Sequence, residues 1–146
     1  MNLLTKHIII FLITLLLSYI LVYDLVDFFR VQKEAYYDLW ERTSNQQYHI
    51  EYLSSINKMY LSILFSTLVI TPVVGQIALY FELEKRRIEN FFTSYSKLNI
   101  MGIVLYIFIF LFWLLKPDFK YMSILTYITL PIFVFLLIYR YHQDAK

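Results

Sequence analysis

The chain has 146 residues, of which 60% are hydrophobic and 16% are charged. Soluble domains average about 45–50% apolar and about 25% charged residues, so this composition excludes a disordered chain and argues against a water-soluble globule. The net charge of +2 is too small for a nucleic-acid-binding surface, and the lack of cysteine excludes disulfides, thiol catalysis and iron–sulfur clusters.

Four mostly apolar stretches dominate the sequence. A membrane-spanning helix needs about 20 such residues, and these stretches are apolar on all sides, whereas the helices of a soluble bundle carry a polar face. We therefore expect an all-α integral membrane protein, a single transmembrane domain over residues 1–146 that contacts the lipid bilayer as a four-helix bundle running up, down, up and down. The predicted spans are residues 8–29, 59–81, 98–116 and 120–140.

Residues 30–58, between the first two spans, predict an antiparallel helical hairpin outside the bilayer. Arg30 and Glu34 are opposite charges four residues apart, a spacing typical of a solvated helix face. Ser44 and Gln47 match a capping box, in which each side chain satisfies a free backbone N–H at the start of a helix. Helices 1 and 2 are thus expected to continue from the membrane into this hairpin.

Breaks in the pattern predict the remaining boundaries. Pro72 and Pro131 lie inside spans and should kink their helices, because proline removes a helical hydrogen bond. The second helix should be the longest of the four and should bend near Pro72. Residues 90–96 are polar and predict a connector, and Asp118 is placed to cap the fourth helix.

The basic residues near the span ends predict the orientation. Seven Lys and Arg residues fall on the side of the termini and six on the other side. The dense cluster Lys85, Arg86 and Arg87 favours cytoplasmic termini in a bacterial cytoplasmic membrane, or in an organellar inner membrane. The hairpin would then face outward.

Two groups of polar residues could form an intramembrane site. Asp24 and Asp27 lie one turn apart, which suits a cation or proton site, or two hydrated interfacial residues with Arg30 close to Asp27. Ser62, Ser66 and Gln76 belong to one stripe of small or polar residues down the second helix. That stripe could line a conduit or allow close helix packing, and in either case Gln76 should face protein.

Aromatic residues crowd the predicted hairpin. They could be anchors for a protein partner, because Tyr and Trp bury a large area while keeping a polar tip. They could also pack the two arms against each other. The five candidate partner-binding residues are Tyr36, Tyr37, Trp40, Tyr48 and Tyr52.

The chain has few residues in patterns typical of catalytic or metal sites. His7, His49 and His142 lie outside the predicted spans, and no two have the spacing of metal ligands, so no metal or cofactor is expected. No nucleophile is paired with a base, so we expect no enzyme. The leading hypothesis is a non-catalytic membrane protein that acts by protein–protein contact, as a small subunit, accessory factor or immunity-type factor. The alternative is a homo-oligomeric pore lined by the polar stripe.

Overall fold

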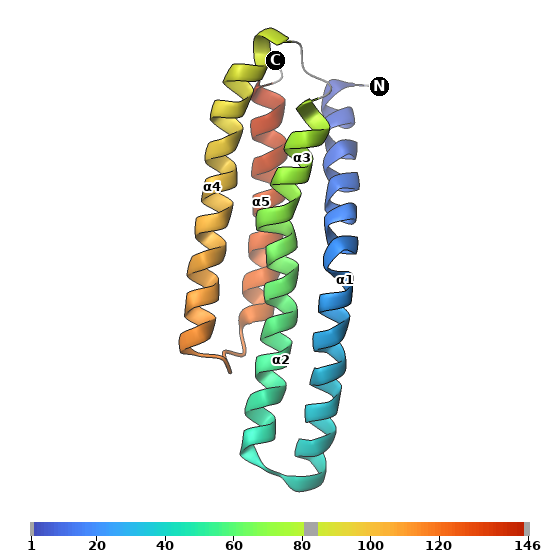
Figure 1. Cartoon of the computed structure of the whole chain (residues 1–146), viewed down its shortest axis with the longest axis vertical. Coiled ribbons are helices and arrows are strands. Elements are labelled where there is room, and N and C mark those ends of the chain that lie inside the picture. Colours follow the sequence, from blue (N-terminus) through green and yellow to red (C-terminus); the bar gives the residue numbers. More distant parts are fainter. Residues whose placement is uncertain (1, 81–84, 145–146) are drawn as a thin grey trace.

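The computed structural model describes the backbone of residues 2–80 and 85–144 and the side chains of residues 2–77 and 97–143. Within these residues the chain is helical with no strand, which confirms the all-α prediction. The elements in chain order (Figure 1) are α1 (Leu3–Thr43), α2 (Gln46–Phe65), the π-helix η1 (Ser66–Ile70), α3 (Thr71–Tyr80), α4 (Lys85–Leu115) and α5 (Met122–Asp144).

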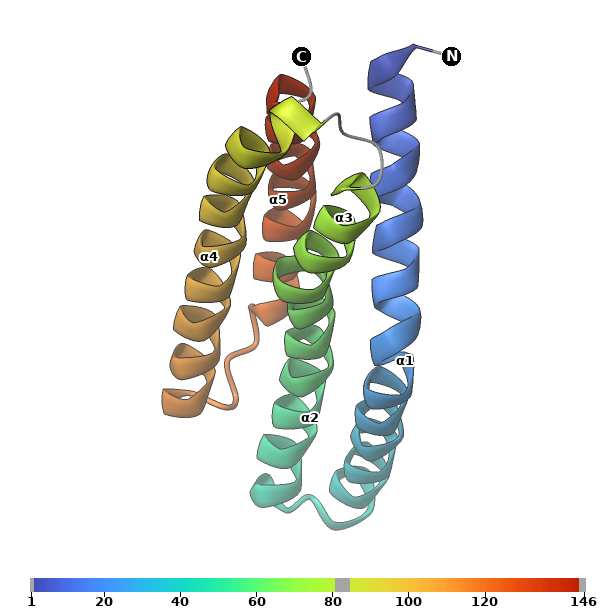
Figure 2. The same ribbon diagram turned by 45° about the horizontal axis from the view of Figure 1, so that its top comes forward.

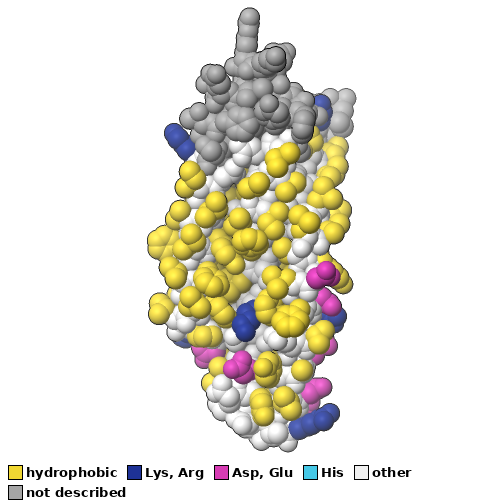
Figure 3. Space-filling model, in the orientation of Figure 1, with side chains coloured by type: hydrophobic (Ala, Val, Ile, Leu, Met, Phe, Trp, Pro, Cys, Tyr) yellow, Lys and Arg dark blue, Asp and Glu magenta, His cyan; other side chains and the backbone are white. Residues whose placement is uncertain are grey.

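Four segments are long and apolar enough to cross a membrane, as the sequence predicts. They are Leu3–Thr43, Gln46–Ile77, Lys97–Leu115 and Met122–Gln143. Large apolar side chains remain exposed around the bundle, up to 86% exposed at Leu115. Figure 3 shows apolar side chains over much of the described part of the face in view, with the acidic residues of that face gathered toward the end that carries the α1–α2 connection. Such a surface suits hydrocarbon rather than water.

The rod formed by α2, η1 and α3 is central. It packs against α1, α4 and α5. In its most apolar 18-residue stretch 50% of the residues are buried, against 11–22% in the corresponding stretches of the other three spans. Both chain termini lie at one end of the molecule (Figure 1). At the other end, the connection between α1 and α2 lies well beyond the connection between α4 and α5, as Figure 2 also shows.

Apolar side chains from all four spans form the core around the central rod. Several small hydroxyl residues are buried between the helices and donate hydrogen bonds to the carbonyl four residues earlier on their own helix, which satisfies those donors inside the bundle. Ser66 Oγ is an exception, since it is buried without a hydrogen-bond partner among the described residues. The core includes Phe11, Leu61, Leu64, Leu68, Ile109, Met122, Phe133, Leu137 and Tyr141. The buried hydroxyl donors include Thr14, Ser18, Ser62, Thr67 and Thr126.

The central rod is interrupted next to Pro72, where the sequence predicts a kink. The five residues of η1 shift the backbone hydrogen bonds by one residue, so that the Thr71 N–H and its Oγ1 both donate to the Ser66 carbonyl, the latter over 2.9 Å.

The prediction that the second helix is the longest is wrong. Because α1 contains neither proline nor glycine, it runs unbroken for 41 residues, whereas α2, η1 and α3 comprise 20, 5 and 10.

The turn between α1 and α2 corrects the predicted capping box. Ser44 ends α1 in the left-handed region with φ 53°, and its N–H donates to the Trp40 carbonyl over 2.7 Å. Asn45 is the N-cap of α2, and its Oδ1 accepts from the Gln47 N–H over 2.9 Å. Both residue types can cap a helix. Ser44 is needed to reverse the chain, so the cap moves one residue on.

Two further boundaries differ from the prediction. Residues 90–96 are part of α4 and form no connector, since they contain no glycine or proline that would end a helix. Asp118 lies four residues before Met122, where α5 begins, so it cannot cap that helix. The side chains of Lys85, Arg86 and Arg87, on which the predicted orientation depends, lie outside the described residues.

Candidate functional site

Four rings join the two arms of the α1–α2 hairpin, and we call them the hairpin aromatic cluster: Tyr37, Trp40, His49 and Tyr52. The Trp40 and His49 ring centroids lie 4.4 Å apart across the two arms. Tyr37 reaches Tyr52 on the other arm at 5.4 Å and Trp40 on its own arm at 5.9 Å. Tyr52 is also 6.2 Å from His49. The cluster therefore ties α1 to α2 near the turn.

The structure brings three of the five predicted partner-binding aromatics into this cluster. Tyr36 and Tyr48 are half-buried and make no ring contact among the side chains that the structure describes. The sequence reasoning missed His49. A signal for it exists, since Trp40 and His49 are equally far from the two-residue turn Ser44–Asn45, and an antiparallel pair of helices places such residues opposite each other.

An apolar ridge runs along the opposite face of α1, at three- and four-residue steps. It consists of Phe28, Val31, Ala35 and Leu39. Phe28 is 55% exposed, Val31 53% and Leu39 40%, and Ala35 is exposed as well. Eleven residues of helix rise about 16 Å, so the ridge continues from the apolar span into the charged part of α1.

The two aspartates at the start of the hairpin differ in their contacts. Asp27 accepts from Arg30 Nη2 over 2.6 Å, and Arg30 Nη1 reaches Glu34 Oε1 at 3.2 Å. Hydrogen bonding to Asp27 and the charges of Asp27 and Glu34 raise the pKa of the exposed Arg30 guanidinium. Asp24 is exposed and takes no part in this chain of ion pairs. The Asp27–Arg30 pair is the contact that the interfacial alternative names, and the choice between an ion site and two interfacial residues stays a prediction.

The predicted polar stripe is divided by η1. Ser62 and Ser66 are buried, and Ser62 Oγ donates to the Lys58 carbonyl over 2.9 Å. Gln76 Oε1 accepts from Asn99 Nδ2 of α4 over 2.6 Å, so Gln76 has the protein partner that the sequence predicts. Ser62 lines a groove beside α4, whereas Ser66 lines a different one beside α1. A regular helix would align these three residues on one face. Here Ser62 bonds its own helix, Gln76 bonds α4, and Ser66 Oγ has no hydrogen-bond partner among the described residues.

The fold brings together two histidines that the sequence separates by 135 positions. His7 Nδ1 lies 3.2 Å from His142 Nδ1, within hydrogen-bonding distance. The His7 ring is buried and also contacts the Tyr141 ring, with centroids 4.2 Å apart. Sequence spacing does not predict this contact, because it depends on how α1 and α5 pack against each other. Two nitrogen ligands fall short of a metal site, and the described residues contain no group of three His, Asp or Glu side chains that could hold a metal ion.

Comparison with known proteins adds no assignment: no family model matches the chain, and neither a curated protein nor a solved structure matches it significantly. The functional argument therefore depends on the geometry of the hairpin, of its apolar ridge and of the grooves between the helices.

Proposed function

We propose that the chain is a non-catalytic multi-pass membrane protein that acts by binding another membrane protein through the α1–α2 hairpin. In this proposal the four spans cross the bilayer up, down, up and down, and the hairpin stands outside it. The termini lie in the cytoplasm, by the predicted distribution of basic residues. The protein would be a small subunit, accessory factor or immunity-type factor of a membrane complex.

The apolar ridge is the observation that carries the proposal. Phe28, Val31 and Leu39 are each at least 40% exposed on a segment whose neighbours include Arg30, Glu34 and Asp38. In the hydrocarbon core such side chains need no protein partner. Beyond it they would be exposed to water, which costs about 25 cal/mol of free energy per Å² of apolar area. A partner helix laid along α1 would bury them.

The hairpin aromatic cluster supports the same role by stiffening the element that carries the ridge. Rings in contact across both arms restrict the arms relative to each other. A surface held rigid before binding loses less conformational entropy on association. Tyr37 belongs to this cluster and is still 41% exposed while it touches Tyr52.

Site-specific photo-cross-linking in native membranes tests the proposal. A photoreactive residue at Val31 or Leu39 is expected to yield an adduct with a second protein, identified by mass spectrometry. Glu34 and Glu41 are matched control positions, since they are exposed on another face of the same helix. A second substitution, Ala35→Asp, should abolish the adduct, because it places a charge in the centre of the ridge.

The other outcomes contradict the proposal in different ways. Adducts formed only between copies of this chain would favour the alternative, a homo-oligomeric pore, and bilayer conductance sensitive to Gln76→Leu would then be expected. Equal cross-linking from ridge and control positions, or none from either, would show that the ridge is not a recognition surface.

A further inference from the structure

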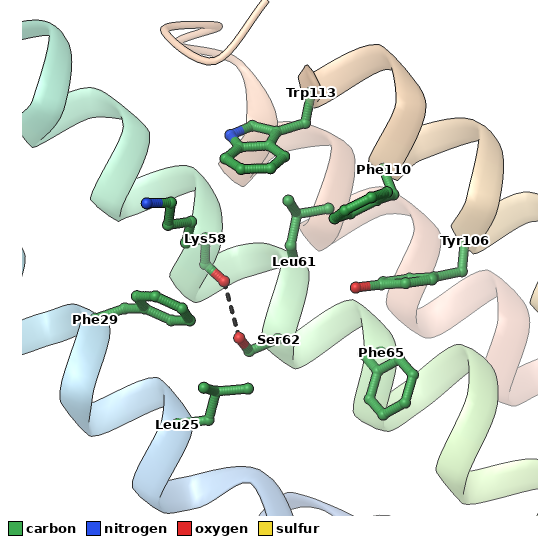
Figure 4. Close-up of a pocket in the computed structure, with 9 residues that line it drawn as sticks. All are labelled: Leu25, Phe29, Lys58, Leu61, Ser62, Phe65, Tyr106, Phe110 and Trp113. Atoms are coloured by element: carbon green, nitrogen blue, oxygen red, sulfur yellow. Dashed lines mark hydrogen bonds between the residues drawn. The ribbon is translucent and has the colours of Figure 1, made fainter. Parts of the chain in front are cut away.

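A groove opens between α1, α2 and α4, close to where the hairpin leaves the bundle (Figure 4). Its volume is about 540 Å³, within the usual range of about 300–1,000 Å³ for small-molecule pockets. Figure 4 shows the Tyr106 hydroxyl pointing into it. The walls are mostly apolar and are formed by Leu25, Phe29, Leu61, Ser62, Phe65, Tyr106, Phe110 and Trp113.

One cation stands at the mouth of the groove. Lys58 Nζ lies 5.9 Å from the centroid of the Phe29 ring and 5.9 Å from that of the Trp113 ring. Lys58 has no carboxylate within 4 Å in the part of the chain that the structure describes. Two aromatic faces hold the ammonium group over the opening, so the groove has an uncompensated positive charge at one end.

A hydrogen-bond donor at the same end also lacks a partner. Trp113 Nε1 is buried and has no acceptor within the described residues. A buried indole N–H without an acceptor has lost its hydrogen bond to water and gained none in return. An acceptor introduced at the mouth would satisfy this need after a small shift of the indole.

The long axis of the groove runs in the direction that a lipid chain takes in a bilayer, from the headgroup level toward the hydrocarbon. Next to Lys58, Asn57 Nδ2 donates to the Pro117 carbonyl of the α4–α5 connection over 2.6 Å, which places the mouth at the end of the α4 span. The other end, at Phe65 and Tyr106, lies seven residues further along α2 and α4, or about 10 Å into the bundle. The charged end thus faces the headgroup level and the apolar end faces the hydrocarbon.

We propose that this groove binds one acyl chain of an anionic phospholipid, with Lys58 on the phosphate. The inference requires the chain to span a membrane, but not the partner contact proposed above. An anionic lipid supplies both missing elements, a negative charge for Lys58 and an acceptor for Trp113. A second copy of an apolar helix would supply neither, and it would remove the ammonium group from water without a counter-charge.

Trp113 fluorescence tests this inference in the full-length chain. The chain has two tryptophans, so Trp40→Phe leaves Trp113 as the sole emitter. The variant is placed in mixed vesicles of phosphatidylcholine and phosphatidylglycerol, with bromine on the acyl chains of one lipid or of the other. The quenching by each brominated lipid gives its relative association constant for the site beside Trp113. We expect this constant to be about fivefold higher for phosphatidylglycerol than for phosphatidylcholine, because that is the preference for anionic lipid that one basic residue near the membrane surface contributes.

Substitutions then assign the preference to the groove. Lys58→Gln should bring the ratio close to parity, and Lys58→Arg should keep it. Lys120→Gln is the matched control, because Lys120 lies at the same end of the bundle with its Nζ 5.4 Å from the Tyr121 ring centroid, outside the groove. It should leave the ratio unchanged. Circular dichroism verifies that each variant remains folded.

Three results would overturn the inference. Equal quenching by the two lipids would mean that the groove holds no selected lipid. A preference retained in Lys58→Gln would place the anionic site elsewhere. Quenching by neither lipid would mean that protein, such as a second copy of the chain, fills the groove. These outcomes are independent of the cross-linking result, so either proposal can fail alone.

Discussion

Gly102 of α4 lies directly against the backbone carbonyl of Leu68 in η1. A Cβ placed on Gly102 would lie 2.7 Å from Phe133 Cζ and still closer to the Leu68 oxygen. Pro72 has no N–H to donate to the carbonyl four residues before it, which is that of Leu68. Because Gly102 has no side chain, α4 can cover the backbone at the point where proline removes a regular hydrogen bond. Membrane helices tolerate such a loss when a neighbouring helix covers the freed carbonyl.

Gly102→Ala should destabilise the protein, although helix propensity alone predicts the opposite sign. Alanine favours a helix over glycine by about 1 kcal/mol. The added methyl group would overlap the Leu68 carbonyl and the Phe133 ring, and overpacking costs about 1–3 kcal/mol. We expect a net loss of about 1 kcal/mol in the free energy of unfolding, measured by titrating detergent-solubilised protein with dodecyl sulfate.

Val104→Ile is the matched control for this test. It adds one carbon to the same helix on an outward-facing side chain, since Val104 is exposed. Its unfolding free energy should stay within about 0.5 kcal/mol of the parent. A stabilised Gly102→Ala variant would contradict the close approach of α4 to η1.

The Gln76–Asn99 hydrogen bond should couple α3 to α4. In membranes such pairs contribute about 0.6 kcal/mol and at most about 1.7 kcal/mol. Gln76→Leu leaves the Asn99 amide without the acceptor that it now reaches at 2.6 Å. A double-mutant cycle of Gln76→Leu and Asn99→Leu, followed by the same titration, is therefore expected to give a coupling energy in this range.

A second cycle provides the comparison. Ser62 donates to the Lys58 carbonyl of its own helix and does not reach Asn99. Ser62→Ala combined with Asn99→Leu should thus be additive within about 0.3–0.5 kcal/mol. Equal coupling in both cycles would mean that the Gln76–Asn99 bond has no special role in joining the helices.

Composition and periodicity predict the helical class and the four apolar spans because both depend on local sequence. The need of Gln76 for a protein partner is predictable for the same reason, since an amide in an apolar span has few alternatives. Its identity as Asn99 is not, because that choice depends on how α3 and α4 align. The π-helix next to Pro72 is a similar case: the proline predicts an interruption but not the form that it takes.

The contacts that define the sites are non-local, which is why sequence spacing missed them. His7 and His142 meet only because α1 and α5 pack side by side at the end that carries the termini. Lys58 gains its position from Phe29 of α1 and Trp113 of α4. The contact between Trp40 and His49 would have been predictable, because the turn between their helices has only two residues.

The turn of the hairpin should tolerate, and gain from, a glycine. Ser44 adopts φ 53°, a conformation in which a side chain is strained and glycine is not. Ser44→Gly is therefore expected to raise the free energy of unfolding by about 0.5–1 kcal/mol, and to slow amide hydrogen exchange in the part of the hairpin near the turn. Thr43→Gly, one residue earlier and still inside α1, is the control. It should lower stability by about 1 kcal/mol, because glycine disfavours a helix and because the Thr43 hydroxyl bond to the Leu39 carbonyl, 2.6 Å long, is lost. A loss of stability in both variants would show that Ser44 is not left-handed and that the two arms are joined by a different turn.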